Sequence, residues 1–325
     1  MKKYREFWLL VILVFLIAAC RTDSQNVEEY NIYDRFYLEK KLIIDELTSV
    51  ELNLEDQLIS SFFVTSENVI YLFSRTFGLI YKMDENGHIL SETGGIGRGP
   101  GEFITENLVT LAYCGSEIFF AFDLSQARLQ VYDLDLNLLN SIILNSVPYD
   151  VSCVGDRRLA VLYAYIPKID IINYEGELYE EILPDVPFGE SKESVFRHFN
   201  YINENTYTLS YYFKPLLLWI NRNERLKRDI VLSKLEFQDV HFAVRKASVV
   251  GDELHLFYMN INRDLPEPEH KVTHVFHKND GEYLFSYRIP ERISNLQFIS
   301  NNRIATLEDS LRTIAIYDFK IKANE

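Results

Sequence analysis

The sequence predicts an all-β fold, a six-bladed β-propeller whose last blade is closed by an N-terminal strand. A unit of apolar strand, polar loop, second strand and Asp- or Asn-containing turn recurs every 41 to 50 residues, a period typical of propeller blades. The 325 residues include 21 tyrosines and 22 phenylalanines, and aromatic residues favour strands. The six units begin their first recognisable strand near Ile70, Ile118, Leu159, Tyr207, Leu254 and Ile304.

Residues 68–90 show one unit most clearly. The strand that follows Ile70, like the one that follows Ile118, is almost continuously apolar, which indicates a sheet buried on both faces between neighbouring blades. A tight turn is predicted at Asp84, because the Asn-Gly pair that follows supplies positive φ angles. We expect the anchors to mark each blade's second strand, and fourth strands at residues 89–93, 138–144, 178–183, 226–232 and 283–289. Corresponding turns are predicted to begin at Asp133, Asn173, Asn221 and Asp318.

The sixth unit lacks a fourth strand, since the chain stops soon after Asp318. Upstream of the first unit, residues 41–54 (KLIIDELTSVELNL) are strand-like but belong to no unit. We therefore expect this segment to complete the last blade, which would remove the exposed edges of an open ring. The predicted propeller spans residues 41–325.

The N-terminus has the three parts of an export signal. A basic start precedes an apolar run that is short for a membrane span, and residues 17–20 (IAAC) resemble the lipobox of bacterial lipoproteins. Residues 1–19 are predicted to be a lipoprotein signal peptide, Cys20 the lipidated residue, and 20–40 the lipidated Cys and its tether. An ordinary signal peptide or an uncleaved anchor are the alternatives. Arg21, rather than Asp, follows Cys20, which favours the outer membrane within the cell envelope.

Charge and cysteine content limit the possible partners of the protein and the cellular compartments in which it could lie. The chain has a net charge of −15, which argues against nucleic acid as a partner because nucleic acid requires a basic patch. Apart from Cys20, the chain contains only Cys114 and Cys153. An exported protein could form a disulfide between them, but two buried free thiols are the simpler interpretation.

A Gly-rich segment, residues 94–103 (GGIGRGPGEF), lies between the fourth strand of one unit and the first strand of the next. Together with residues 123–133 (DLSQARLQVYD), it resembles the NHL repeat. The whole arrangement is similar to the NHL- or TolB-like six-bladed propeller lipoproteins common in Bacteroidetes. Only the second unit carries the full motif. A phosphate-binding P-loop is excluded, because neither Lys nor Ser/Thr follows Gly101.

Enzymes with six-bladed propellers often hold a metal at the central channel. In the gluconolactonase family the metal ligands are Glu, Asn and Asp side chains from different blades. No cofactor is predicted here, although a divalent cation in the channel is an alternative. The histidines at 270, 274 and 277 are interpreted as surface or packing residues, because a strand would not place all three on one face. Candidate metal donors near the ends of the inner strands are Glu67, Asn107, Asp150, Asn203 and Asn301.

Loops between second and third strands combine tyrosines with basic residues. In NHL-like rings these loops and the Gly-rich crossing lie on one rim, where tyrosine buries a large area with little entropy lost. The alternative is that the tyrosines cap strand ends and pack between blades. In the fifth unit the loop carries a Pro-rich insertion around residues 261–270. The candidate rim residues are Arg75, Arg98, Tyr163, Tyr165, Tyr211, Tyr212, Lys214, Tyr258 and Arg263.

These observations favour a non-enzymatic function. We expect a lipoprotein of the cell envelope, attached to the membrane through its lipid anchor, whose rim binds a protein, peptide or glycan. The alternative is a metal-dependent, lactonase- or lyase-like enzyme that acts at the central channel.

Overall fold

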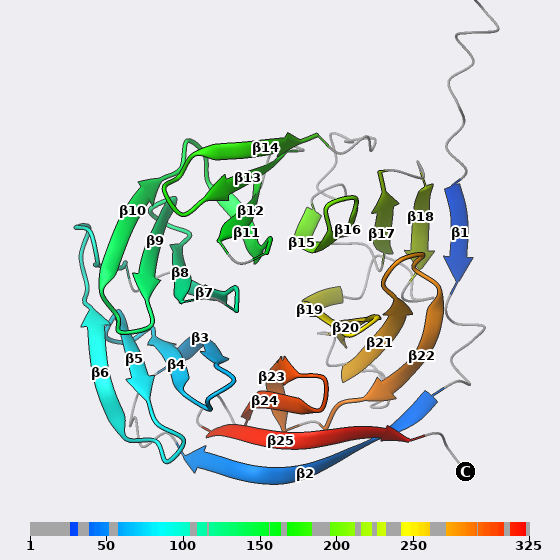
Figure 1. The fold of residues 1–325 in the computed structure, drawn as a ribbon, viewed down its shortest axis with the longest axis horizontal. Coiled ribbons are helices and arrows are strands. Elements are labelled where there is room, and N and C mark those ends of the chain that lie inside the picture. Colours follow the sequence, from blue (N-terminus) through cyan, green and yellow to red (C-terminus); the bar gives the residue numbers. More distant parts are fainter. Residues whose placement is uncertain are drawn as a thin grey trace, which may run out of the picture.

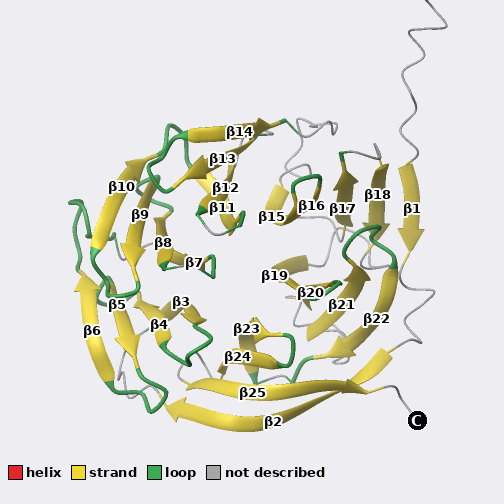
Figure 2. Cartoon of the chain, viewed as in Figure 1, coloured by secondary structure: helices red, strands yellow, loops and turns green. Residues whose placement is uncertain are grey.

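The computed structural model describes residues 27–31, 39–51, 58–104, 109–115, 117–155, 157–163, 168–183, 196–211, 216–222, 226–231, 242–260, 271–290, 292–308 and 313–322. Figure 1 shows a ring of six blades around a central axis, and all regular elements drawn are strands (Figure 2). Among the described residues, no helix has the length and apolar character needed to span a membrane.

Each blade is an antiparallel sheet of four consecutive strands, except the last. The order of the strands from the axis outward follows the chain. Blade one contains β3 (Ile59–Val64), β4 (Ile70–Ser74), β5 (Leu79–Met83) and β6 (Ile89–Gly94). Blade two contains β7 (Val109–Tyr113), β8 (Ile118–Asp123), β9 (Arg128–Asp133) and β10 (Leu138–Ile143). Blade three contains β11 (Pro148–Cys153), β12 (Arg158–Tyr163), β13 (Ile169–Asn173) and β14 (Leu178–Ile182).

The second half of the ring repeats this plan. The predicted six-bladed propeller is confirmed, and each anchor falls in a second strand. Blade four contains β15 (Phe196–Asn203), β16 (Thr206–Tyr211), β17 (Leu216–Asn221) and β18 (Leu226–Val231). Blade five contains β19 (Phe242–Val250), β20 (Glu253–Asn260), β21 (Lys271–His277) and β22 (Tyr283–Arg288). Blade six contains β23 (Ile293–Ser300), β24 (Arg303–Glu308), β25 (Thr313–Lys322) and the N-terminal β2 (Glu39–Glu51).

The N-terminal strand closes the ring as predicted. β2 pairs antiparallel with β25, from Lys41 opposite Lys322 to Glu51 opposite Thr313. This pairing continues past Asp318, which faces Asp45. The predicted turn at Asp318 is therefore wrong, because the ladder with β2 keeps this part of β25 extended.

Strand pairing also extends into the segment predicted as a tether. Within residues 20–40, β1 (Val27–Asn31) pairs in parallel with β18 and forms a fifth strand on blade four. The first two residues of β2, Glu39 and Lys40, pair in parallel with β22 of blade five. The chain thus contacts the outer edges of two blades before it enters blade six (Figure 1).

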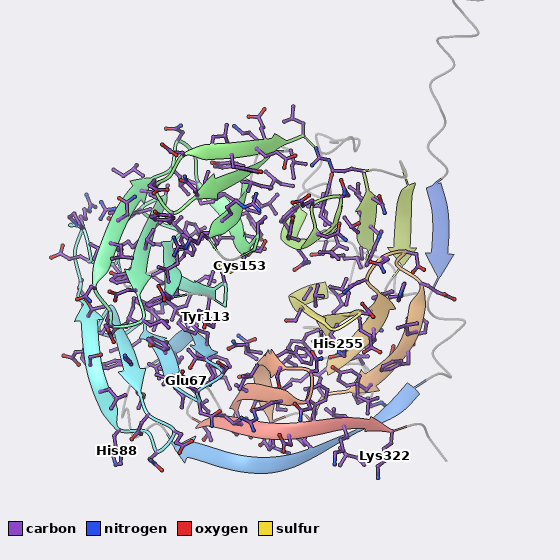
Figure 3. All side chains as sticks on the ribbon, in the orientation of Figure 1. Glu67, His88, Tyr113, Cys153, His255 and Lys322 are labelled. Atoms are coloured by element: carbon purple, nitrogen blue, oxygen red, sulfur yellow. A yellow bond between two sulfur atoms is a disulfide. The ribbon has the colours of Figure 1, made fainter. Side chains whose placement is uncertain are left out.

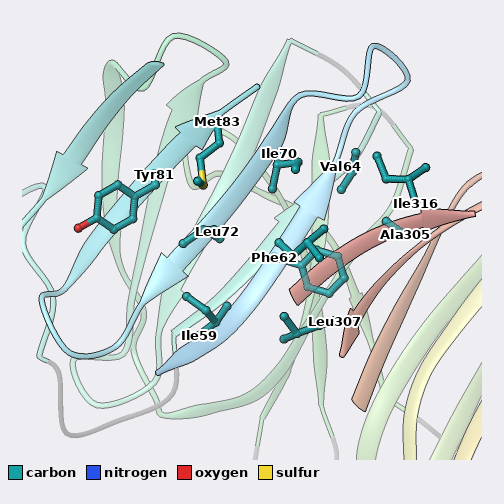
Figure 4. Close-up of a cluster of buried hydrophobic side chains, with 11 residues drawn as sticks. Ile59, Phe62, Val64, Ile70, Leu72, Tyr81, Met83, Ala305, Leu307 and Ile316 are labelled. Carbon is teal, nitrogen blue, oxygen red and sulfur yellow. The ribbon is translucent and has the colours of Figure 1, made fainter. Parts of the chain in front are cut away.

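Apolar side chains fill the spaces between blades. All residues of β4 and all residues of β8 are buried, whereas every residue of the outer strand β6 is exposed or half-buried. The middle strands are apolar on both faces because each face meets a neighbouring blade. Figure 4 shows the cluster that joins blades one and six, in which Phe62 and Leu72 of blade one meet Leu307 and Ile316 of blade six.

The outer hairpin turns follow one chemical pattern. The side-chain Oδ1 of Asp84 accepts hydrogen bonds from the backbone N–H groups of Asn86 and His88, and Asp133 and Asn173 do the same in blades two and three. These predicted turns are confirmed. Gly87 has a φ of 85°, so the glycine alone of the Asn-Gly pair provides the positive φ.

Candidate functional site

The Gly-rich crossing and the β4–β5 loop meet on one rim of the propeller. The Gly95 N–H donates to the carbonyl oxygen of Gly78 over 2.8 Å, and the Phe103 N–H donates to Gly95 over 2.8 Å. Gly94 has a φ of 113°, and a Cβ there would lie 2.5 Å from the Gly78 oxygen. Only glycine permits this conformation and this approach. The prediction that these two segments share a rim is confirmed.

Blade two fixes the crossing through polar side chains of β8 and β9. The Asp123 carboxylate accepts a hydrogen bond from the Ile104 N–H, and the Gln130 side chain accepts from the Gly101 N–H over 2.6 Å. Gln130 also donates to the carbonyl oxygen of Glu102. The two halves of the NHL-like motif, residues 94–103 and 123–133, are therefore joined by hydrogen bonds. Its Asp and Gln serve to position the loop, which explains their occurrence beside a Gly-rich segment.

Three apolar side chains are exposed on this rim and form what we call the blade-one patch: Leu58, Phe77 and Ile96, with exposed fractions of 54%, 46% and 64%. Backbone contacts hold them together, since the carbonyl oxygen of Leu58 accepts from the Arg75 N–H, and Phe77 and Ile96 flank the Gly78–Gly95 hydrogen bond. Leu58 and Ile96 are not among the rim residues predicted from the sequence. Their signal was an apolar residue within a Gly-rich or polar loop.

Basic residues flank the blade-one patch. Arg98 is exposed at the crest of the crossing, and Arg75 is half-buried beside Phe77. The Glu102 carboxylate accepts a hydrogen bond from the Gly99 N–H over 2.7 Å, so it folds back over the loop. The patch therefore combines apolar surface with a guanidinium on a loop that is held by hydrogen bonds.

Tyr163, a predicted rim residue, is buried. Its hydroxyl donates to the Asp170 carboxylate over 2.9 Å, and Lys168 pairs with Asp170 and with Glu181 over 3.1 and 2.8 Å. Burial, followed by the interaction with Asp170, raises the pKa of the Tyr163 hydroxyl. The alternative that the tyrosines pack at strand ends describes this residue, so Tyr163 adds no exposed surface to the rim.

For the remaining rim candidates, the structure describes the backbone of two residues and no atoms of the other four. Tyr211 ends β16 and Tyr258 lies within β20, and of these two only the backbone is described. The other four lie outside the described residues: Tyr165, Tyr212, Lys214 and Arg263. The same holds for the signal segment 1–19, for Cys20 and for the insertion at 261–270.

The predicted channel donors lie in different structural settings. The Asn203 side chain accepts hydrogen bonds from the N–H groups of Asn205 and Thr206 and so caps its own turn. Asp150 accepts from the Phe199 N–H over 3.3 Å and links blade three to blade four. Glu67 lies in the β3–β4 turn (Figure 3). Asn301 lies in the β23–β24 turn, and Asn107 is outside the described residues.

Two of the three histidines predicted to be surface or packing residues are described, and neither belongs to a metal cluster of described residues. His274 is buried, and its Nδ1 lies 2.8 Å from the Ser286 hydroxyl. Burial lowers the pKa of His274 to about 3. His277 pairs with Asp280 over 3.0 Å. Across the described residues there is no group of three or more His, Cys, Asp or Glu side chains that could hold a metal ion.

Cys114 and Cys153 form a disulfide between blades two and three. The prediction of two free thiols is wrong. Cys114 directly follows β7 and Cys153 ends β11, and these neighbouring inner strands bring the two Cα atoms within 5.3 Å. Figure 3 marks Cys153 near the centre of the ring. Because disulfides persist in oxidising compartments, this bond indicates an extracytoplasmic location.

Comparison with solved structures identifies similar folds. A member of the DUF4221 family from Bacteroides vulgatus is 13% identical, with a TM-score of 0.60 over 88% of this chain and 99% of that one. A Bacteroides fragilis protein named for presumed export is 11% identical, with a TM-score of 0.52 over 91% and 100%. The virginiamycin B lyase of Staphylococcus aureus is also 11% identical, with a TM-score of 0.54 over 86% and 99%.

The chain is a six-bladed β-propeller. At these identities the likeness shows the fold alone. No family model matches the sequence, and no curated protein matches it.

Proposed function

We propose that this protein is a non-enzymatic binding module of the cell envelope, and that the rim carrying the blade-one patch binds a protein or peptide. The observation that carries the proposal is the joint exposure of Leu58, Phe77 and Ile96 beside Arg98. Aromatic residues and arginine dominate the binding energy of protein interfaces, and clustered exposed apolar side chains are typical of interaction sites.

The rigidity of the rim supports this proposal. The hydrogen bonds from Gln130 and Asp123 fix the crossing before a partner arrives. A surface that is ordered in advance loses less entropy on binding. The net charge of −15 repels most acidic partners at long range. At short range, the exposed guanidinium of Arg98 can attract a single acidic group of the partner.

A photo-crosslinking experiment tests the proposal. A photoreactive amino acid replaces Ile96 on the rim or, as a matched control, Ile143, which is 73% exposed on the outer strand of blade two. Illumination of cells that produce the protein is expected to give a discrete adduct from position 96 and none from position 143. Phe77→Ala in the same chain should remove the adduct. Identical adducts from both positions would contradict the proposal.

The membrane anchor forms a second part of the proposal. We infer a lipoprotein of the NHL- or TolB-like Bacteroidetes type, lipidated at Cys20 and held at the outer membrane. The similarity to two Bacteroides proteins and the disulfide support this placement. Metabolic labelling with a tagged fatty acid tests this placement: the wild type should incorporate the label and Cys20→Ser should not. Equal labelling of both, or no labelling of the wild type, would exclude lipid anchoring at this residue.

The competing hypothesis is a metal-dependent, lactonase- or lyase-like enzyme that uses the central channel. One similar structure is a lyase, but the low identity carries no activity over to this chain. Metal analysis of the purified, tag-free protein separates the two hypotheses. A stoichiometric divalent ion whose removal lowers the melting temperature would favour the enzyme.

A further inference from the structure

A pocket of about 480 Å³ lies between blades five and six, within the range of about 300–1,000 Å³ found for small-molecule sites. It opens at the rim opposite the blade-one patch, because the β19–β20 and β23–β24 turns border it and these turns lie at the other end of each blade. The two turns are close to each other, since a Cβ on Gly251 would lie 3.9 Å from the side-chain nitrogen of Asn301. The residues that line the pocket are Val250, Glu253, His255, Phe285, Asn301, Phe319, Lys320, Ile321 and Lys322.

Blade five supplies a carboxylate to this pocket, and two further side chains hold it in place. The Glu253 carboxylate lies 3.0 Å from Nε2 of His255, and Nδ1 of His255 lies 3.0 Å from the Tyr287 hydroxyl. The His255 side chain is 1% exposed and that of Glu253 is 37% exposed. A ligand would therefore meet Glu253 first, while His255 and Tyr287 fix the position of the carboxylate.

The direction of these hydrogen bonds follows from the protonation of the two buried groups. Burial lowers the pKa of His255 and raises that of the Tyr287 hydroxyl. The neutral ring therefore donates from Nε2 to the Glu253 carboxylate and accepts from the Tyr287 hydroxyl at Nδ1. The hydrogen bond to His255 occupies one oxygen, Oε2, of Glu253. The other oxygen can accept a hydrogen bond from a ligand.

The wall on blade six is apolar. Phe319 and Ile321 lie two residues apart on β25 and therefore share one face of the strand. This face is directed toward blade five, because Ile321 packs against the cluster that contains Phe285. Val250 and Phe285 add apolar surface from blade five. A ligand in this pocket would thus lie between a fixed carboxylate and a largely apolar surface.

The two lysines that border the pocket do not form a wall opposite the carboxylate. Lys320 and Lys322 alternate with the apolar residues of β25, so their side chains continue the face of Ile316, which packs against blade one. Both lysines are exposed. Figure 3 shows Lys322 at the outer end of β25, apart from His255. The charge that a ligand meets between the two walls is therefore that of the carboxylate.

We propose that this pocket binds a small amine, whose ammonium group contacts Glu253 and whose apolar body lies between Phe285 and Phe319. A carboxylate fixed beside apolar surface complements both parts of such a molecule. The net charge of −15 attracts cations to the protein and repels anions. An anion of the same shape is therefore disfavoured by the pocket and by the protein as a whole.

Calorimetric titration with four related probes tests the assignment: phenethylamine, phenethyl alcohol, ethylamine and phenylacetate. The alcohol lacks the charge, ethylamine lacks the ring, and phenylacetate reverses the charge. Loss of the charge is expected to weaken binding about tenfold, the usual size of a hydrogen bond to a charged group. Loss of the ring should weaken it by at least as much, because the buried apolar area is lost. Equal affinity for phenethylamine and any other probe, or no binding of phenethylamine at millimolar concentration, would overturn the proposal.

Two variants assign the ammonium group to its partner. Glu253→Gln keeps an acceptor for the Nε2–H group of His255 but loses the charge, so the preference for phenethylamine over phenethyl alcohol should disappear. Lys320→Gln/Lys322→Gln is the matched control, because these side chains lie on the other face of β25, and it should keep the preference. A preference that persists in Glu253→Gln, or that disappears in the lysine variant as well, would contradict the contact with Glu253.

Filling the pocket provides a test that is independent of charge. Val250 lies opposite Glu253 in the pairing of β19 with β20, so Val250→Trp places a large side chain in the pocket. Val249→Trp places the same side chain on the other face of β19, at a residue that is 41% exposed. Only the first variant should lose binding of phenethylamine, with both melting temperatures reported. Equal loss in the two variants would show that the amine binds elsewhere. Neither substitution touches the blade-one patch, so the crosslinking experiment stays independent of this one.

Discussion

The guanidinium of Arg128 donates a hydrogen bond from Nη1 to the carbonyl oxygen of Gly99 over 2.6 Å. Arg128 begins β9 in blade two, and Gly99 lies in the crossing from blade one. This charge-assisted hydrogen bond fastens the crest of the crossing to the next blade. We predict that Arg128→Ala lowers the free energy of unfolding by about 1–3 kcal/mol.

Arg98 offers a matched control for that variant, because it precedes Gly99 and is exposed. Arg98→Ala should change the free energy of unfolding by less than about 0.5 kcal/mol. Urea denaturation of the two variants measures the difference. Equal losses would show that the hydrogen bond to Gly99 contributes nothing specific to stability.

Gly94→Ala should destabilise the crossing more than the same change elsewhere. Both Gly94 and Gly115 have positive φ, at 113° and 77°, but a Cβ at Gly115 would meet no atom within 4 Å, whereas one at Gly94 would lie 2.5 Å from the Gly78 oxygen. Strain in φ alone costs about 1–2 kcal/mol. We expect Gly115→Ala to show that cost and Gly94→Ala to exceed it clearly in melting temperature.

The disulfide should make a large contribution to stability. Cys114 and Cys153 are separated by 39 residues, and closing a loop of this length removes unfolded-state entropy equivalent to about 4 kcal/mol. Cys114→Ser/Cys153→Ser should lower the midpoint of urea denaturation, and added reductant should lower the wild-type midpoint in a similar way. A reductant effect of the same size on the double variant would argue against the disulfide as its cause.

Buried His274 predicts a stability that falls in acid. Its folded-state pKa is about 3, and that of an unfolded histidine is about 6.5. Between these values only the unfolded chain binds the proton, so the free energy of unfolding decreases by about 1.4 kcal/mol per pH unit as the pH falls, and this residue has no effect above pH 6.5. From pH 7 to pH 5 the loss is about 2 kcal/mol, and His274→Gln should reduce it.

The periodic features of this fold could be predicted from the sequence. Anchors such as Ile70 and Ile118 mark second strands because strands buried on both faces are apolar throughout. The ring closure followed from a strand-like segment without a unit of its own. The prediction of a turn at Asp318 was wrong because an isolated Asp gives the same local signal whether the chain turns or pairs with a distant strand.

Features that depend on non-local geometry could not be predicted. The partner of Cys114 depends on how two inner strands approach the axis, and spacing alone does not fix that approach. A pocket of about 480 Å³, which Val250, Glu253, Phe285 and Phe319 help to line, combines residues from β19, β20, β22 and β25 that share no motif. Tyr163 was predicted to lie on the rim because the local sequence at a strand end is the same whether the tyrosine hydroxyl is exposed to solvent or, as here, donates to Asp170.

Because β2 pairs with β25, the last blade can close only after nearly the whole chain has been synthesised. The first strand of the ring is made early and its partner last, so at roughly 5–20 residues per second β2 waits on the order of tens of seconds without its own edge partner. During that time its apolar centre, Leu42 to Ile44, could join sheets of other chains. Charged residues border this centre on both sides, with Lys40 and Lys41 before it and Asp45 after it. Such flanking charges oppose intermolecular pairing, so the sequence of this strand protects the nascent chain until the propeller can close.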